Sequence, residues 1–268
     1  MDAIVLAGGR IGGDFGQREG VTIKALLAID GITLLERAVR AIRHSRHVER
    51  ICVVGPWEVE GLARCVGADV YVEAQGAGID NLLRGFDALD PSARILCSAC
   101  DLPFLRPSDI DSVIELSPPD AQVTYTIISR AEWQATFPDA QALFVPLSDG
   151  FYTGGCVHVI DMRAIRQVLP LVQKLFAARK SQTAMARLLG LGLTMRLLAA
   201  RHVNRSLGPS TEQARRRAES LIGCRCAIVR GCSPRIAADV DDETDWRYVL
   251  DHQNRLWDYT GESPRKAS

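Results

Sequence analysis

Two glycines and a lysine near the start of the chain form the pattern best suited to chemistry. Residues 3–7 are typical of an apolar strand, which stops at Gly8-Gly9-Arg10 and leads through a Gly-rich stretch to Lys24. Paired glycines let the backbone approach phosphate oxygens closely and turn N–H groups toward them. A lysine supplies a mobile positive charge that can follow those oxygens during a reaction. This spacing predicts a triphosphate site, with an ordinary tight turn and a surface lysine as the alternative.

The loop does not match two common nucleotide-binding motifs. A P-loop places Ser or Thr directly after its lysine to hold magnesium, whereas Lys24 is followed by Ala25. A dinucleotide fingerprint needs the spacing Gly-x-Gly-x-x-Gly, which Gly8-Gly9-Arg10 lacks. We therefore expect a different class of triphosphate site.

Aspartates follow a strand in the first half of the chain and precede a helix near its end. Asp101 comes just beyond a strand at 94–98, and ligands in open α/β sheets collect at the carboxyl ends of strands. Asp239 and Asp241 belong to an acidic run in which Asp242 suits a helix N-cap. Carboxylates are preferred ligands of Mg²⁺ beside substrate phosphates. The pattern predicts magnesium-assisted phosphoryl or nucleotidyl transfer, with a turn or cap role for Asp101 as the alternative.

Composition limits the class of partner. The chain of 268 residues carries 32 basic and 32 acidic side chains, which argues against a nucleic acid or an anionic membrane as the main partner. No apolar run approaches the length of a membrane span, and the first residues enter a strand rather than a signal segment, so we expect a cytoplasmic protein. Among the 8 cysteines, Cys97 and Cys100 have a suggestive spacing, but Cys97 lies in an apolar run where a thiol behaves as a small hydrophobe. Cys224 and Cys226 are separated by one residue, whereas zinc sites usually need two to four, so we expect reduced thiols.

Strands and helices alternate along the first hundred residues, as in the βαβ units of a doubly wound sheet. We expect strands at 3–7, 51–55, 70–72, 94–98, 123–129, 154–160 and 226–229, and helices after Thr33 and at 57–66, 80–89 and 243–254. Residues 161–220 predict an additional helical segment, interrupted at Pro170. The fold class is α/β, with a Rossmann-like, doubly wound and mostly parallel sheet in a single domain over residues 1–258. A disordered tail is expected at 259–268.

Four motifs in order give the chain a resemblance to one family of transferases. They are Leu6-Ala7-Gly8-Gly9, Lys24 before Ala25-Leu26-Leu27, Cys100-Asp101-Leu102-Pro103-Phe104-Leu105, and Asp239-Val240-Asp241. This order resembles the MobA-like NTP transferases, the nucleotidyltransferase family that includes molybdenum-cofactor guanylyltransferase and cobinamide-phosphate guanylyltransferase. The resemblance implies a GT-A-like nucleotidyltransferase fold.

The resemblance also implies roles for individual residues. Lys24 would bind the phosphates and act with Asp101 in catalysis. Asp101 and Asp241 would hold Mg²⁺, with Asp239 as the substitute for Asp241. Nucleotide contacts are implied for Leu6, Ala7, Gly8, Gly9, Arg10, Lys24, Gly76 and Asn81. For Asn81, the alternative to a nucleotide contact is a helix N-cap.

Three features depart from the family pattern. The loop from Ile11 to Ile23 is longer and more polar than in the molybdenum-cofactor enzymes. Tyr152 to Gly155 leads into a strand where relatives place part of the acceptor site, and the following Cys156 stands where many relatives have Asn. The helical segment at 161–220 exceeds a minimal family member, and we expect it to shape a different acceptor pocket.

The predicted function is a Mg²⁺-dependent nucleotidyltransferase that moves NMP from an NTP to a small phosphorylated acceptor and releases pyrophosphate. We expect no nucleic acid or membrane partner, and either a monomer or a homodimer. One alternative is a glycosyltransferase that uses a nucleotide sugar. Such enzymes usually carry an Asp-x-Asp pair at the end of this strand, but here the two positions are Ala99 and Asp101. The other alternative is a nucleotide-binding regulator without catalysis.

Overall fold

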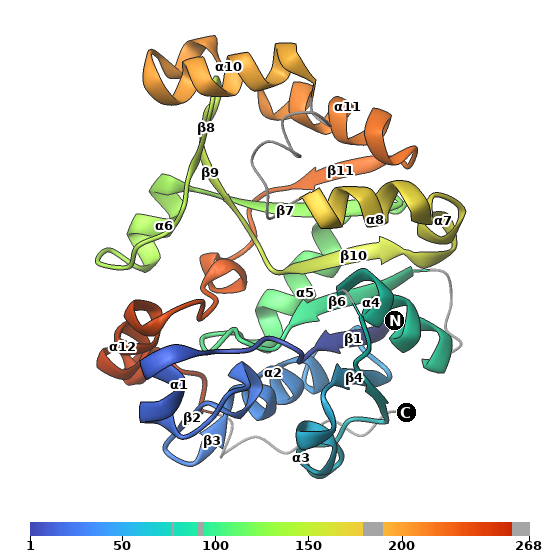
Figure 1. Ribbon diagram of the computed structural model, residues 1–268, viewed down its shortest axis with the longest axis vertical. Helices are drawn as coiled ribbons and strands as arrows, with labels where there is room; N and C mark the ends of the chain where they lie inside the picture. Colours follow the sequence, from blue (N-terminus) through green and yellow to red (C-terminus); the bar gives the residue numbers. More distant parts are fainter. Residues whose placement is uncertain (77, 90–93, 179–189, 259–268) are drawn as a thin grey trace.

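The computed structural model describes residues 1–76, 78–89, 94–178 and 190–258. The tail predicted at 259–268 lies outside these residues. One nine-stranded sheet runs through the molecule, with helices packed against it (Figure 1). Across the described part of the chain, every helix is too short or too polar to cross a membrane.

Four parallel strands form the half of the sheet that the first hundred residues build. They lie in the order β5 (Val70–Glu73), β4 (Ile51–Gly55), β1 (Asp2–Leu6) and β6 (Arg94–Ala99). Successive residues of a strand face opposite sides of a sheet. Ala3 and Val5 accordingly pack into one core cluster, whereas Ile4 packs into another. Because both faces are buried, the predicted doubly wound arrangement is confirmed.

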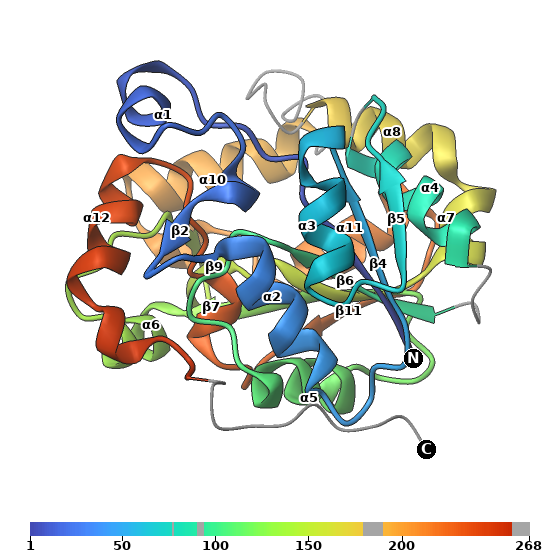
Figure 2. The same cartoon turned by 90° about the horizontal axis from the view of Figure 1, so that it is seen from below.

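Helices cover both faces of this parallel half (Figure 2). One face carries α2 (Leu34–Arg43), α3 (Glu60–Cys65) and α5 (Pro107–Leu116), and the other carries α4 (Gly78–Leu89). Thr33 caps α2 as its position predicts, because its hydroxyl accepts a hydrogen bond from Glu36 N at 3.1 Å. The apolar positions of α2 that predict a helix, among them Leu34, Leu35 and Ala38, are fully buried.

The second half of the sheet mixes antiparallel and parallel pairs. β10 (Val157–Asp161) runs antiparallel to β6 and lies beside β7 (Val123–Ser129). Beyond β7 the sheet continues to β9 (Gly150–Gly154) and β8 (Val145–Leu147). β11 (Cys226–Val229) pairs parallel with β7. The single strand predicted at 154–160 is wrong in extent, since Gly154 ends β9 and Val157 begins β10. Between them Gly155 N donates to Thr126 O at 2.9 Å, which turns the chain from one strand to the next.

The predicted helical segment contains four described helices. They are α7 (Met162–Gln167), α8 (Leu169–Ala178), α10 (Leu191–His202) and α11 (Thr211–Ile222). The first two lie near α4, and the other two contact β8 and β11 at the far end of the sheet (Figure 1). The predicted interruption near Pro170 is confirmed, because α7 ends at Gln167 and α8 begins at Leu169. Pro170 lies in the first turn of α8, where a missing N–H costs no hydrogen bond.

The long loop from Ile11 to Ile23 contains a short helix that the sequence did not predict. This helix, α1 (Gly13–Glu19), ends at Gly20, whose φ of 69° is the left-handed conformation that glycine adopts without strain. Seven residues with two glycines are too few to show a helical period. The chain continues through a 3-10 turn, η1 (Lys24–Leu26), and a small hairpin of β2 (Ala28–Ile29) and β3 (Ile32–Thr33).

Two further helices border the site described below. The unpredicted α6 (Arg130–Thr136) begins with a capping box in which Ser129 and Glu132 satisfy each other's backbone N–H groups. Near the end of the chain, η4 (Pro234–Ala237) precedes α12 (Glu243–Asp251). Asp242 caps α12 by accepting hydrogen bonds from Thr244 N and Asp245 N, so the N-cap predicted at this residue is confirmed.

Candidate functional site

The glycine loop leaves β1 at the carboxyl edge of the sheet, beside the end of β6. Ile11 N donates to Thr22 O at 3.0 Å and Lys24 N donates to Gly9 O at 2.9 Å, so the loop folds back on itself. A Cβ at Gly9 would lie 3.2 Å from Lys24 Cδ, whereas a Cβ at Gly8 would meet no heavy atom within 4 Å. Glycine therefore leaves room both for the lysine side chain and for a ligand close to the backbone.

The Lys24 ammonium lies between carboxylates from the middle and the end of the chain. Its Nζ is 3.1 Å from Oδ2 of Asp101 and 2.6 Å from Oδ1 of Asp241. Lys24 is only 8% exposed, whereas the Asp241 side chain is 74% exposed. Burial alone lowers the pKa of a lysine, but the carboxylates outweigh burial and raise the pKa of Lys24 above its ordinary value. Lys24 is therefore a charged and nearly buried group.

Asp239 completes a cluster of three carboxylates. Val240 N donates to Asp101 O at 3.0 Å, which fixes the late acidic segment beside the end of β6. Asp101, Asp239 and Asp241 each offer one carboxylate oxygen, and these oxygens lie within 4.8 Å of one another. Burial, with repulsion from Asp101 and Asp241, raises the pKa of Asp239 to about 6. The sequence presented Asp239 and Asp241 as alternatives, and the structure brings both to Asp101.

Cys156, the departure from the family pattern, lies against this cluster. Its backbone connects two parts of the site, because Ala99 N donates to Cys156 O at 3.1 Å and Cys156 N donates to Ile236 O at 2.7 Å. Burial and the nearby carboxylates raise the pKa of the Cys156 thiol well above its ordinary value. Cys156 is therefore a neutral thiol close to the carboxylate cluster.

A cavity of about 810 Å³ opens beside the glycine loop, and we call it the glycine-side cavity. Of the predicted nucleotide contacts, Ala7 does not line it: Ala7 is fully buried, and its N donates to Val54 O at 2.8 Å. Lys24 is not among the lining residues either, but its ammonium contacts the lining residues Asp101 and Asp241. The lining includes Leu6, Gly8, Gly9, Arg10, Gly76, Asn81, Asp101, Asp239 and Asp241.

Two amide side chains order the far wall of the glycine-side cavity. The N-cap alternative for Asn81 is wrong, because α4 begins at Gly78. Asn81 Oδ1 instead accepts a hydrogen bond from Gln75 N at 2.7 Å and so orders the segment before α4. Gln173 of α8 donates to Asp80 Oδ1 at 2.9 Å. Sequence reasoning missed Gln173, because 93 residues separate it from Asp80 and no local pattern connects them.

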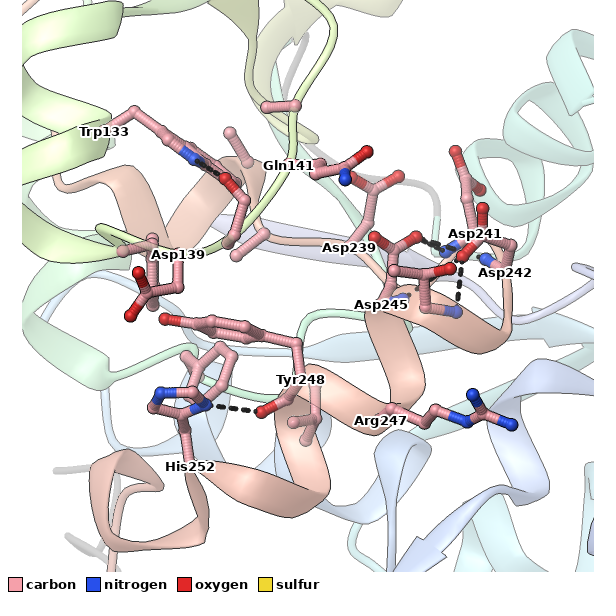
Figure 3. Close-up of a pocket in the computed structure, with 18 of the residues that line it drawn as sticks. Trp133, Asp139, Gln141, Asp239, Asp241, Asp242, Asp245, Arg247, Tyr248 and His252 are labelled. Carbon is pink, nitrogen blue, oxygen red and sulfur yellow. Dashed lines mark hydrogen bonds between the residues drawn. The ribbon is translucent and has the colours of Figure 1, made fainter.

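A second cavity of about 780 Å³ shares Asp239 and Asp241 with the first, and we call it the acidic cavity (Figure 3). Its basic side chain Arg247 donates to Glu243 at 2.5 Å and is therefore paired. The Tyr248 ring stacks on His252, with ring centroids 4.0 Å apart. Besides the shared pair, the lining includes the carboxylates Asp139, Asp242, Asp245 and Asp251 and the aromatic residues Phe104, Trp133, Phe137 and Tyr248.

The additional helical segment does not line the acidic cavity. Within the described part of the chain, no residue from 161–220 contributes to that lining. α10 and α11 instead cover an apolar cavity of about 330 Å³ against β7, β9 and β11, lined by residues such as Leu197, Leu221 and Ile228. Of the described residues in this segment, only Gln173 reaches the glycine-side cavity.

An ion pair connects the long N-terminal loop to the start of α12. Arg18 of α1 donates to the carboxylate of Glu243, and the other oxygen of Glu243 accepts from Arg247. α1 therefore lies beside α12 at the edge of the site (Figure 1). Sequence reasoning missed this contact because 225 residues separate its partners.

The arrangement combines two kinds of charge at the place where the cavities meet. Carboxylate oxygens in a close group suit a hard divalent cation such as Mg²⁺. Lys24, Arg10 and the glycine backbone on the other side suit the oxygens of a phosphate chain. The site can therefore hold a cation and a phosphate chain side by side.

Comparisons with known proteins agree with this arrangement. The family model of the MobA-like NTP transferase domain matches residues 3–205. A curated relative, 2-C-methyl-D-erythritol 4-phosphate cytidylyltransferase of Frankia casuarinae, is 38% identical over 115 residues. That match covers 41% of this chain and 41% of the relative, so the similarity spans less than half of either protein.

Solved structures share the fold along nearly the whole chain. A hypothetical transferase from Thermus thermophilus is similar with a TM-score of 0.79 and 28% identity, over 91% of this chain and 98% of that one. A nucleotidyl transferase from Methanothermobacter has a TM-score of 0.55 and 21% identity, over 95% and 97% of the two chains, and shows the same fold. The resemblance inferred from the four motifs is confirmed, because the family model covers well over half of the residues. The chain belongs to the MobA-like NTP transferase family.

Proposed function

We propose that the protein is a Mg²⁺-dependent nucleotidyltransferase that moves a nucleoside monophosphate from a nucleoside triphosphate to a small phosphorylated acceptor. The observation that carries this proposal is the meeting of Lys24 with Asp101 and Asp241 at the junction of two cavities. One cavity has a glycine-rich backbone suited to phosphates, and the other is large enough for a second substrate. Transfer between two bound substrates requires this juxtaposition.

The glycine-side cavity would hold the nucleotide. A triphosphate over Gly8 and Gly9 meets no side chain from these positions, and Arg10 adds a positive charge. Lys24 would pair with the phosphates and neutralise charge that develops on the leaving group. Leu6, Gly76 and Asn81 would border the nucleoside.

The three carboxylates fit a magnesium site, since all three present oxygen ligands in one group. Asp101, Asp239 and Asp241 would hold the ion. When bound, Mg²⁺ neutralises phosphate charge and orients the reacting groups. Asp239 and Asp241 border both cavities, so a metal ion bound to them would lie where the two substrates meet.

The acceptor would enter from the acidic cavity. An oxygen of its phosphate attacks the α-phosphorus of the nucleotide and forms a new phosphoanhydride bond. The bond from the α-phosphorus to its bridging oxygen breaks, and pyrophosphate leaves through the glycine-side cavity. No covalent enzyme intermediate is required, so the protein acts by positioning the reactants and balancing their charge.

A ligand screen followed by a turnover assay tests the proposal. We would measure thermal unfolding of the full chain with ATP, GTP, CTP, UTP and nucleotide sugars, each with and without Mg²⁺. Binding at 100 times Kd stabilises the folded state by about 2.7 kcal/mol, which gives a clear rise in Tm. We expect one or more triphosphates to raise the Tm, and pyrophosphate to appear when a phosphomonoester acceptor is added.

Two outcomes contradict the proposal. Stabilisation by a nucleotide sugar alone would indicate a glycosyltransferase. Stabilisation by a triphosphate without pyrophosphate release, across a broad panel of phosphorylated acceptors, would indicate a regulator that binds nucleotides without catalysis.

A further inference from the structure

The Lys24 ammonium lies at the position of the cation that the carboxylates would otherwise bind. Its Nζ is within 3.1 Å of Asp101 Oδ2 and 2.6 Å of Asp241 Oδ1, and both residues belong to the group whose oxygens lie within 4.8 Å of one another. In the described part of the chain, these carboxylates are the hydrogen-bond partners of the Lys24 ammonium. The positive charge of the lysine therefore offsets part of the negative charge of the acidic cluster.

A divalent cation and this ammonium would compete for the carboxylates of Asp101 and Asp241. Mg²⁺ binds carboxylate oxygens at about 2.0–2.1 Å in a nearly octahedral arrangement. An ammonium that remains within hydrogen-bonding distance of Asp101 and Asp241 would then lie a few ångströms from the ion, and the two positive charges would repel each other. Each positive charge therefore weakens the binding of the other at these carboxylates.

The space beside the glycine loop leaves room for the ammonium to move. The aliphatic part of Lys24 runs along Gly9, where a Cβ would come within 3.2 Å of it, and the adjacent Gly8 faces open space. A lysine side chain has four rotatable carbon bonds and a compact charge, so its ammonium can move while the backbone stays in place. Phosphate oxygens bound over Gly8 and Gly9 would provide the acceptors that make such a move favourable.

We propose that Lys24 is an internal competitor for the divalent cation, and that a bound triphosphate removes this competition by drawing the ammonium away from Asp101 and Asp241. The inference rests on the proposed function, because it assumes a triphosphate in the glycine-side cavity. Lys24 then acts as a positioning residue that couples the two ligands. Such coupling is reciprocal, so the nucleotide and the cation each raise the affinity for the other.

Binding of Mn²⁺ alone tests the competition without any turnover. We would measure Mn²⁺ affinity by electron paramagnetic resonance and calorimetry for the wild type and for Lys24→Met, which keeps a side chain of similar length without the charge. We expect Lys24→Met to bind Mn²⁺ at least tenfold more tightly than the wild type in the absence of nucleotide.

The matched control is Arg10→Met, which removes a positive charge from the same cavity. Arg10 lines the cavity, but its described contacts include no hydrogen bond or ion pair with the carboxylates. We expect its Mn²⁺ affinity to stay within about twofold to threefold of the wild type. Equal affinity in the wild type and Lys24→Met would overturn the proposal. An equal gain in Arg10→Met would also overturn it, because the effect would then be general electrostatics rather than competition for the same oxygens.

Thermal unfolding keeps the test informative if Lys24→Met is less stable. Without the ammonium, the acidic cluster lacks its cation, and we expect added Mn²⁺ to raise the Tm of Lys24→Met by more than it raises the Tm of the wild type. A larger shift in the wild type would contradict the proposal. Triphosphate binding is measured separately without metal: if no triphosphate binds, the proposed function fails, whereas the Mn²⁺ comparison still tests whether Lys24 competes with the cation.

Discussion

The two cavities that meet at Asp239 and Asp241 are built from different kinds of residue. The glycine-side cavity is bordered by the backbone of the glycine loop, by Arg10 and by carboxylates that include Asp101. The Lys24 ammonium adds positive charge beside it through its pairs with Asp101 and Asp241. The acidic cavity is bordered by aspartates and aromatic rings from α6, the loop after it and α12 (Figure 3). The first is suited to phosphate groups that all nucleotides share, and the second has little positive charge to offer.

This difference indicates where the two kinds of specificity reside. A backbone cradle recognises phosphate whatever nucleoside is attached to it. Side chains from distant parts of the sequence give the acidic cavity its individual shape and charge, so we expect it to select the acceptor. Variants on the two sides should therefore separate nucleotide affinity from acceptor selection.

The largest expected effect comes from the carboxylate at the end of β6. Asp101→Asn keeps the size of the side chain and an oxygen that can accept from Lys24, but it removes a charged metal ligand. We expect kcat to fall by about 10³-fold or more, since a metal ion contributes several kcal/mol to stabilising the transition state. Steady-state pyrophosphate release measures this loss, and circular dichroism checks the fold.

The matched control for this variant is Asp120→Asn. Asp120 is an exposed aspartate before β7, at the edge of the sheet opposite the site. Its substitution should leave turnover unchanged. Turnover by Asp101→Asn at near wild-type rate under saturating Mg²⁺ would remove the basis for placing the metal at this junction.

The next effect concerns the cradle itself. A Cβ at Gly8 would meet no protein atom within 4 Å, so Gly8→Ala should leave the free energy of unfolding nearly unchanged. The added methyl group projects into the glycine-side cavity, and we expect nucleotide affinity to fall by about tenfold because phosphate can no longer approach the backbone. Calorimetry of triphosphate binding measures the change. Gly12→Ala, also with open space around its Cβ but outside the cavity lining, should bind normally.

The same contrast explains which parts of the site could be predicted from the sequence. Gly8 and Asp101 each follow an apolar strand, and in a doubly wound sheet the carboxyl ends of neighbouring parallel strands meet at one edge. These local patterns therefore predicted the glycine-side cavity. They also placed the N-cap at Asp242, because capping depends on residues a few positions apart.

The acidic cavity depends on contacts that no local pattern contains. Asp139 and Tyr248 come from segments more than a hundred residues apart and meet only in the folded chain. The segment after α6 has neither the period of a helix nor that of a strand. α1 was missed for a related reason, since its seven residues are too few to show a period and Arg18 pairs with the distant Glu243.

A smaller effect tests the junction between the cavities through stability. The folded protein holds the pKa of Asp239 at about 6, above the value of about 3.9 expected for an unfolded chain. Between these values the folded state binds more protons, so this residue lowers stability as the pH rises from about 4 to 6. The difference of about two between these pKa values corresponds to about 2.8 kcal/mol, and partial exposure of Asp239 to solvent reduces the net effect. Asp239→Asn stays neutral, and without metal we expect it to be more stable than the wild type by about 1 kcal/mol at pH 7 and nearly equal to it at pH 4. Urea unfolding across this pH range measures the difference in free energy of unfolding between the variant and the wild type. A difference that does not grow with pH would contradict the raised pKa of Asp239.

The smallest expected effect comes from the rim of the acidic cavity. Asp139 is exposed and lies on the Tyr248 side of this cavity (Figure 3). Its negative charge repels a phosphorylated acceptor, and exposed charge interactions of this kind contribute about 0.2–1 kcal/mol. We therefore expect Asp139→Asn to lower the acceptor KM by about twofold to threefold, because this energy range corresponds to a small factor in affinity. Nucleotide affinity should stay unchanged, as it should in the Asp120→Asn control. If Asp139→Asn instead altered nucleotide affinity and left the acceptor KM constant, the charge of Asp139 would be acting on the nucleotide. The acidic cavity would then hold the nucleotide, and the glycine-side cavity would hold the acceptor.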